Sequence, residues 1–197
     1  MRQLVLASTS PRRADLLRAL EVEFTAVDPG LGDAAEQALV VEALQAGVSP
    51  SGVVRRVALA KLLAACARGH SGPLLACDTV VADGPRLLGK PQDEAAARAM
   101  LESLRGRVHD VWSGVAYVDA RGSLTLDAER SRVRFRAFAP ERLDAFLASG
   151  QWRGKAGAYG VQDEEAGFLW EAVEGSVSNV KGLPVERVAP LVTAGRG

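Results

Sequence analysis

Almost at its start the chain reads Leu4-Val5-Leu6-Ala7-Ser8-Thr9-Ser10-Pro11-Arg12-Arg13-Ala14-Asp15-Leu16-Leu17. The apolar run at its beginning predicts a β-strand. Ser10 followed by Pro11 is the pattern of a helix N-cap with proline at the first helical position. The leucines that follow at helical spacing would face a core, at Leu16, Leu17 and Leu20. The rest of the chain can therefore be organised around a strand, a tight turn and a helix.

The turn between this strand and helix predicts a site for an anion. The N-terminus of a helix offers backbone N–H groups and the positive end of the helix dipole. Ser8 and Ser10 would supply hydroxyl groups there. Arg12 and Arg13 would supply guanidinium groups, whose fork matches the geometry of phosphate. The alternative is an ordinary first strand and helix with solvated arginines.

Length and composition are those of an ordinary globular protein. At 197 residues and 20.8 kDa the chain is long enough for one domain or two small lobes, and we treat residues 1–197 as a single domain. The formal net charge is zero, which gives no electrostatic indication of a nucleic-acid or membrane partner. No apolar run approaches the roughly 18 residues of a membrane span, and the start of the chain lacks a signal-peptide pattern.

The two cysteines, Cys66 and Cys77, both lie in apolar stretches. This placement predicts reduced thiols in the core of a cytoplasmic protein. With two histidines besides, the chain lacks the spacing of cysteine and histidine that a zinc site requires.

Strand and helix patterns are interspersed along the chain and predict a mixed-sheet α/β protein. After the first strand, strand patterns cover residues 23–27, 73–82, 108–118 and 124–138. After the first helix, helical patterns cover residues 36–46, 49–69, 93–104, 140–149 and 184–194. The glycine-rich residues 150–184 predict loops around short strands. The expected architecture is a mixed twisted sheet with flanking helices.

The strand expected at 124–138 carries a basic face. Its arginines alternate with apolar residues, at Arg130, Arg132, Arg134 and Arg136. One wet face of an antiparallel strand explains this pattern, and no aromatic side chains are interleaved with the arginines as on a nucleic-acid surface. The rival interpretation is a nucleic-acid-binding module, which predicts salt-sensitive binding of oligonucleotides.

Asp78 interrupts an otherwise apolar strand pattern. A carboxylate buried without partners is costly, so its position there favours a functional role. A fixed carboxylate can hold Mg²⁺ or orient a water molecule as a general base. The alternative is an aspartate at a strand end that reaches solvent.

Two lysines and a glutamine are further candidates. Lys61 lies between apolar residues of a helical pattern, where a buried role and a narrow solvated stripe both fit. Lys90 follows a turn that returns from the Asp78 strand and could reach the same cleft. Residues 155–162 read KAGAYGVQ, a run with enough glycine for close backbone approach to a ligand. Gln162 could read a base edge through its paired donor and acceptor, and a tight turn is the alternative.

Seven short segments of the chain, taken in order, match the motifs of a known protein family. They are LASTSPRR (6–13), AK (60–61), DTVV (78–81), GKP (89–91), His109 with SGV (113–115), KAGAYGVQ (155–162) and EGSVSNVKGLP (174–184). Together they resemble the Maf family of nucleoside triphosphate pyrophosphatases, also called septum formation inhibitor proteins. Any one segment is weak, but seven in order over nearly the whole chain are highly specific. The resemblance implies two lobes around a central nucleotide-binding cleft, as in inosine triphosphatases.

The resemblance implies hydrolysis of a nucleoside triphosphate to the monophosphate and pyrophosphate, with Mg²⁺ or Mn²⁺ as cofactor. It further implies a homodimer in the cytoplasm, with no nucleic-acid or membrane partner. The Asp78-Thr79 pair and Gln162 are similar to the branch that acts on dTTP and UTP. Activity on modified pyrimidine nucleotides would make the protein a house-cleaning enzyme of the nucleotide pool.

The family's site residues can be carried over position by position. The resemblance implies catalytic roles for Asp78, Lys61 and Lys90. It implies roles in substrate binding or specificity for Arg12, Thr79, Gln162, Ser8, Ser10 and Arg13. It implies Asp78 and Asp33 as the metal ligands.

Two positions depart from the family pattern. Asp33 stands where relatives usually carry glutamate, so its carboxylate is one methylene shorter, and Glu36 is the alternative metal ligand. Trp112 precedes Ser113 where a smaller or threonine-containing pair is more usual, and the sequence offers no physical reason for it.

Two other functions are open at this point. The first is a nucleotide-binding regulator of septum formation and cell division that does not turn its ligand over. The second is the same chemistry on purine or 7-methyl-GTP substrates. A panel of nucleoside triphosphates distinguishes all of these.

Overall fold

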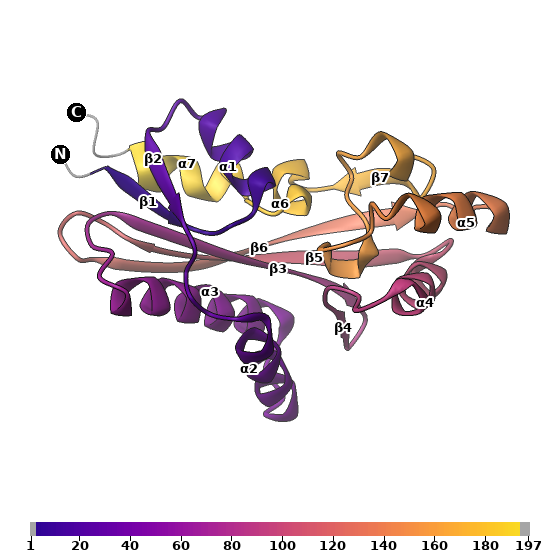
Figure 1. Cartoon of the computed structure of the whole chain (residues 1–197), viewed down its shortest axis with the longest axis horizontal. Helices are drawn as coiled ribbons and strands as arrows, with labels where there is room; N and C mark the ends of the chain where they lie inside the picture. Colours follow the sequence, from indigo (N-terminus) through magenta and orange to yellow (C-terminus); the bar gives the residue numbers. More distant parts are fainter. Residues whose placement is uncertain (1–2, 194–197) are drawn as a thin grey trace. The chain divides into compact units, whose positions relative to one another are not determined.

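The structure, a computed structural model, describes residues 3–193 of the chain. Its strands form one mixed sheet in the order β2-β1-β3-β5-β6-β7, and β4 pairs with β3 (Figure 1). The strands are β1 (Leu4–Ala7), β2 (Phe24–Val27), β3 (Leu74–Asp83), β4 (Arg86–Leu88), β5 (Val108–Val118), β6 (Leu124–Phe135) and β7 (Trp170–Glu174). β1 pairs in parallel with β2 and β3, whereas β4 is antiparallel to β3 and β7 to β6. The predicted mixed sheet with flanking helices is confirmed.

The helices begin and end close to where their sequence signals stand. They are α1 (Pro11–Arg18), α2 (Asp33–Gln45), α3 (Pro50–Ala67), α4 (Glu94–Leu104), α5 (Pro140–Ser149), α6 (Val177–Lys181) and α7 (Val185–Thr193), with short 3₁₀ turns η1 (Ala156–Ala158) and η2 (Glu164–Ala166). Ser49 caps α3 by accepting from Gly52 N at 3.4 Å. Asp93 caps α4 by accepting from Ala96 N at 2.7 Å. Gly150 ends α5 in the left-handed conformation that glycine adopts most readily.

The differences from the predicted boundaries are small and local. β6 ends at Phe135, three residues before the predicted end at Phe138. α6 lies inside a segment predicted to be loops, since five residues are too few for a helical period to appear. The predicted end of the last helix, Ala194, lies outside the described residues.

The chain divides into two compact units. The first comprises Met1–Asp78, Ser113–Glu129 and Gly182–Gly197, and the second comprises Thr79–Trp112 and Arg130–Lys181. The strands β3, β5 and β6 each contribute residues to both units. Each unit has a hydrophobic core of its own.

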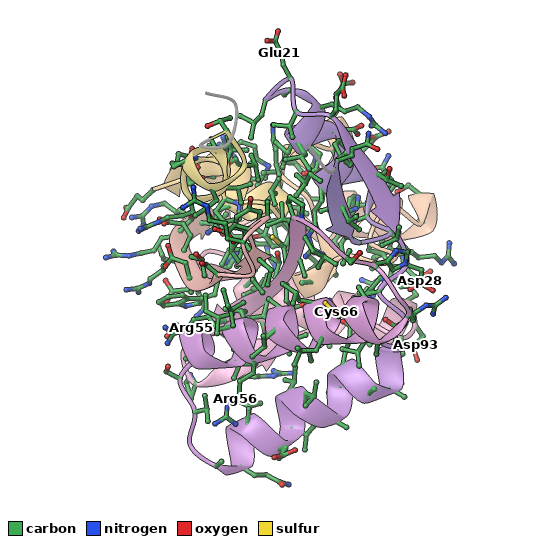
Figure 2. All side chains as sticks on the ribbon, turned by 90° about the vertical axis from the view of Figure 1, so that its left-hand side faces the viewer. Glu21, Asp28, Arg55, Arg56, Cys66 and Asp93 are labelled. Carbon is green, nitrogen blue, oxygen red and sulfur yellow. The ribbon has the colours of Figure 1, made fainter. Side chains whose placement is uncertain are left out.

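In the first unit, helices pack on both faces of the strands (Figure 1). Alternate residues of β3 supply the two faces: Leu75 and Cys77 pack with α1 and α7, whereas Leu74 and Ala76 pack with α3. This alternation is why the strand reads as a continuous apolar run. α2 packs on α3, away from the sheet (Figure 2).

Gly114 lets α3 lie directly on β5. A Cβ atom at this position would stand 2.2 Å from the backbone oxygen of Val54 and 2.8 Å from Arg55 N. No side chain fits there, because the obstructing atoms are the backbone of a helix. The glycine of the Ser113-Gly114-Val115 segment therefore has a packing role.

The predicted core position of Cys66 is wrong. Cys77 is buried, but Cys66 is exposed on α3 (Figure 2). The face of α3 that packs on the sheet runs through Ala58, Leu62 and Ala65. Cys66 follows Ala65 by one residue and so points about 100° away from that face.

The arginines of β6, and Arg136 directly after it, face outward as predicted and have partners on neighbouring strands. Arg130 lies 2.9 Å from Asp110, Arg132 lies 3.4 Å from Glu174, and Arg134 lies 3.7 Å from Glu171. Arg136 donates from Nε to Trp170 O at 3.0 Å. Cross-strand pairing is therefore a sufficient reason for the basic stripe.

The second unit has an aromatic core with one buried polar pair. Phe135, Phe138 and Phe168 pack edge to face, with ring centres 6.5 and 5.6 Å apart. His109 Nε2 lies 2.6 Å from the hydroxyl of Tyr159, and both residues are buried. This hydrogen bond fixes residues 155–162 to β5. Burial lowers the pKa of His109 from 6.5 to about 4, with a smaller contribution from the Arg107 charge.

The lowered pKa predicts an acid-sensitive fold. The unfolded chain binds a proton at His109 below about pH 6.5, whereas the folded chain does so only near pH 4, so stability is lost as the pH falls between these values. At about pH 4 the loss amounts to about 3 kcal/mol in the free energy of unfolding. We expect His109→Gln, which keeps a partner for Tyr159 but does not titrate, to remove this loss in urea titrations at pH 7 and pH 4.

The matched control for this substitution is His70→Gln. A His109→Gln variant that loses stability between pH 7 and pH 4 as steeply as the unsubstituted protein would contradict the prediction.

Candidate active site

A buried ionic cluster in the first unit is the strongest candidate for a site. Lys61 Nζ lies 2.8 Å from Asp78 Oδ1 and 2.9 Å from Glu36 Oε2. Lys61 is 7% exposed and Asp78 is 8% exposed, so little water solvates either charge. Charges this deeply buried are costly unless paired, and here one ammonium joins two carboxylates.

The periods of β3 and α3 bring Lys61 and Asp78 together. Asp78 lies on the same face of β3 as Leu74 and Ala76, the face that α3 covers. Lys61 stands one turn from Ala58 on the helix, next to the residues that pack on that face. The two alternative interpretations, a solvated lysine stripe and an aspartate reaching solvent, are therefore wrong.

The structure brings Glu36 to the same ammonium group that Asp78 contacts. Asp33 is the first residue of α2 and is exposed, whereas the Glu36 side chain, three residues later, is 18% exposed and contacts Lys61. The sequence had offered Glu36 as the alternative to Asp33. The carboxylate of Glu36, one turn along the helix from Asp33, therefore joins Lys61 and Asp78 in the cluster.

In the turn from β1 to α1, hydrogen bonds hold the side chain of Arg13 in place. Arg13 donates from Nε to Gly182 O at 2.8 Å and from Nη1 to Ser8 Oγ at 3.3 Å. Ser8 Oγ also accepts from Ser10 N at 3.2 Å. Because both acceptor positions of the buried Ser8 hydroxyl are used, its proton is the part of the group that can meet an anion. Arg12 follows Pro11 in the first turn of the helix and is half-buried.

Ser10 takes the N-cap position but not the predicted side-chain role. Its backbone is extended, as at an N-cap, yet its hydroxyl makes no capping hydrogen bond. The first turn of α1 thus keeps backbone N–H groups that the Ser10 hydroxyl does not satisfy.

A pocket of about 250 Å³ lies at this turn. Its lining residues are Ser8, Thr9, Ser10, Pro11, Ala14, Ala26, Val27 and Asp28. Hydroxyl groups and a helix N-terminus at one wall are what an oxyanion or a sugar requires.

Cys77 stands next to Asp78 but is not suited to be a nucleophile. Burial raises the pKa of its thiol to about 11, against the smaller opposing effect of Arg13 and Lys61. The reactive form of cysteine is the thiolate, which is scarce at neutral pH when the pKa is high.

The remaining predicted residues belong to the second unit. Thr79 is half-buried on β3, Lys90 is exposed after β4, and Gln162 is exposed at the end of residues 155–162. Gly157 N donates to Gly89 O at 3.0 Å, so this segment is fixed beside the residue that precedes Lys90.

The segment 155–162 holds an unusual backbone. Gly157 has a positive φ of 66°, and a Cβ there would stand 2.8 Å from Val81 Cγ2. Ala158 also has a φ of 66°, a conformation that costs a non-glycine residue of order 1 kcal/mol. The hydrogen bond of the next residue, Tyr159, to His109 helps to hold the segment in this shape.

Trp112 now has a physical role. The guanidinium of Arg130 lies over its ring, 5.7 Å from the centre, and the same group pairs with Asp110. The ring therefore supports a cross-strand ion pair between β5 and β6.

A protein-family model, described as Maf-like protein, matches residues 3–194. The chain belongs to the Maf family. A relative from Myxococcus xanthus named dTTP/UTP pyrophosphatase is 45% identical over 193 residues, which cover 98% of this chain and 92% of the relative. A relative of the same name from Desulfitobacterium hafniense is 42% identical and covers 95% of this chain and 82% of its own length.

A solved structure supports the fold of this Maf-family protein. A HAM1 protein from Coxiella burnetii superposes with a TM-score of 0.50 at 17% identity and covers 99% of this chain and all of its own. At that identity the likeness is one of fold.

The donor set of the ionic cluster suits a hard divalent cation. Asp78 and Glu36 already place oxygen atoms around one positive charge, and Mg²⁺ and Mn²⁺ prefer oxygen ligands. Among residues 3–193 no three histidine, cysteine or acidic side chains form a ready metal site. Two carboxylates fit a metal that takes its other ligands from water and phosphate. None of the helices in those residues has the length and apolar character to cross a membrane.

We expect Lys61→Met to destabilise the protein, because it leaves the carboxylates of Asp78 and Glu36 without the cation that both contact. Removing one partner of a buried ion pair costs about 3–5 kcal/mol in the free energy of unfolding. Urea denaturation measures the loss, and Lys61→Met combined with Asp78→Asn should recover part of it.

The matched control is Lys90→Met, which removes an exposed lysine and should change stability by less than about 1 kcal/mol. Equal effects of the two single substitutions would show that the cluster does not stabilise the fold.

Proposed function

We propose that this Maf-family protein hydrolyses dTTP and UTP to the nucleoside monophosphate and pyrophosphate. The observation that carries the proposal is the nearly full-length match to relatives named dTTP/UTP pyrophosphatase at 42–45% identity. The anion-binding turn and the buried Lys61–Asp78 pair are compatible with this chemistry.

The turn from Ser8 to Arg13 is proposed to hold the phosphates. The Ser8 hydroxyl and the start of α1 would donate hydrogen bonds to phosphate oxygens. Arg13 is positioned by Gly182 and Ser8, so its guanidinium needs little further ordering. Lys61 and Lys90 are proposed to neutralise negative charge as it builds on the phosphate oxygens.

Asp78 is proposed as the general base. It accepts from Lys61 through Oδ1, and a carboxylate has further lone pairs with which to take a proton. In the reaction a water oxygen bonds to the α-phosphorus, its proton goes to Asp78, and the bond to the bridging oxygen of pyrophosphate breaks. Pyrophosphate leaves with the electron pair of that bond.

Mg²⁺ or Mn²⁺ is the proposed cofactor, with Asp78 as one ligand. Glu36 contacts the same ammonium as Asp78 and is better supported as the second ligand than Asp33. When bound, the ion would offset phosphate charge and lower the barrier to attack.

Base recognition is assigned to the residues that the family resemblance identifies. Thr79 and Gln162 are proposed to hydrogen-bond the uracil or thymine edge, and Arg12 is proposed to contribute to substrate choice. The same resemblance supports the expectation of a homodimer in the cytoplasm.

A substrate panel tests the proposal directly. We expect pyrophosphate release from dTTP, UTP and modified pyrimidine triphosphates, with much slower release from GTP, ITP and 7-methyl-GTP, and loss of activity when EDTA removes divalent cations. Nucleotide binding without any release, with Mg²⁺ or Mn²⁺ present, would instead support a regulator that does not turn over. Faster release of pyrophosphate from the purine triphosphates than from UTP and dTTP would instead support an enzyme that acts on purine or 7-methyl-GTP substrates.

We expect Asp78→Asn to fold, because Lys61 keeps Glu36 as a partner, but to lose activity. Loss of a positioned general base costs about 10²–10⁴-fold in rate. The measurement is kcat for UTP by pyrophosphate release, with Asp144→Asn, a surface aspartate paired with Arg98, as the matched control. Near-normal turnover by Asp78→Asn would overturn the assignment of the base.

A further inference from the structure

Gln162 is held by its neighbour Asp163. The amide nitrogen Nε2 donates to Asp163 Oδ1 at 3.3 Å. The other carboxylate oxygen of Asp163, Oδ2, is hydrogen-bonded to Lys155 Nζ, and the side chains of this ion pair are 17% and 11% exposed. Asp163 is therefore a half-buried anchor, fixed by a cation on one side and in contact with the exposed Gln162 on the other.

The anchor sets the direction of the Gln162 amide. A glutamine amide can turn by half a rotation, which exchanges its donor and its acceptor ends. An ionised carboxylate only accepts hydrogen bonds, so the nitrogen end must face Asp163. The carbonyl oxygen Oε1 is thereby turned away from Asp163, available to a ligand.

Gly160 gives independent support for this arrangement. A Cβ atom at Gly160 would stand 2.4 Å from Gln162 Nε2 and 2.7 Å from Asp163 Oδ2. The amide and the carboxylate thus lie packed over a backbone that has no side chain. The nitrogen end of Gln162 is enclosed by the protein on this side.

We propose that Asp163 is a positioning residue that makes Gln162 present an acceptor to the base, so that the site selects pyrimidines with a hydrogen on N3. This inference rests on the proposed function. Uracil and thymine carry N3–H, a donor that Oε1 can accept. Cytosine carries an unprotonated N3, whose lone pair would face Oε1 and repel it, and the anchor opposes the half-turn that would relieve the repulsion.

The test compares kcat/KM for UTP and CTP, measured by pyrophosphate release. The unsubstituted protein should favour UTP. Asp163→Asn keeps the size of the side chain, but its own amide can accept from Gln162 Nε2 or donate to Gln162 Oε1. Both orientations of the Gln162 amide then have a partner, so the UTP-to-CTP ratio should fall about tenfold, the effect of one hydrogen bond of ordinary strength. Glu164→Gln removes the adjacent exposed carboxylate and is the matched control, with an unchanged ratio.

A second pair of variants separates positioning from a general structural effect. In a Gln162→Ala background, adding Asp163→Asn should not change the ratio further, because Asp163 acts through the amide. If Asp163→Asn alone fails to fold, Lys155→Met combined with Asp163→Asn removes both charges and carries the same expectation.

Three outcomes overturn the inference: equal use of UTP and CTP by the unsubstituted protein, an unchanged ratio in folded Asp163→Asn, or a further change in the Gln162→Ala background. Failure of the proposed function has a different signature, since the unsubstituted protein would then release no pyrophosphate from UTP or dTTP.

Discussion

The pairing of one lysine with two carboxylates is the constraint on which the first unit depends. An apolar strand and an apolar helix can slide along each other at little cost, because many registers bury similar areas. Lys61 and Asp78 remove this freedom, since any other register would leave a buried charge without its partner. Glu36 extends the same constraint to α2, and Gly114 fixes α3 by direct contact between β5 and the backbone of Val54, two turns before Lys61 on the same face of the helix. Charge and close packing thus determine one register together.

In the second unit, hydrogen bonds hold residues 155–162 in an unusual backbone shape. Residues 155–162 adopt two successive left-handed backbone conformations, one of them at an alanine. The bond from Gly157 N to Gly89 O and the contact of Tyr159 with His109 hold the segment in that shape. A segment that is strained and also fastened at several points is pre-organised, so little conformational entropy is lost when it meets a ligand. Lys155 and Asp163 extend this order to the side chain of Gln162.

Sequence periodicity predicted the elements well because helical and strand patterns are local. Asp78 and Lys61 were recognisable as candidates because each interrupts an apolar pattern. Whether they are buried could not be decided from the pattern, since this depends on which face of α3 meets which face of β3. The same non-local information was needed to prefer Glu36 to Asp33 and to see that Cys66 lies outside the packed face. Asp163 gave no signal at all, because its relation to Lys155 and Gln162 follows a turn and no regular period.

The hydrogen bond from Arg13 to Gly182 joins residues 169 positions apart in the chain. The core beneath it also draws on Leu183 and Val188, which follow that carbonyl. During synthesis on the ribosome the turn from Ser8 to Arg13 emerges long before Gly182, so Arg13 lacks this carbonyl acceptor until the residues between them have been translated. The full set of contacts that orients Arg13 therefore forms late in synthesis, and a chain interrupted before Gly182 contains the arginine without one of the groups that position it.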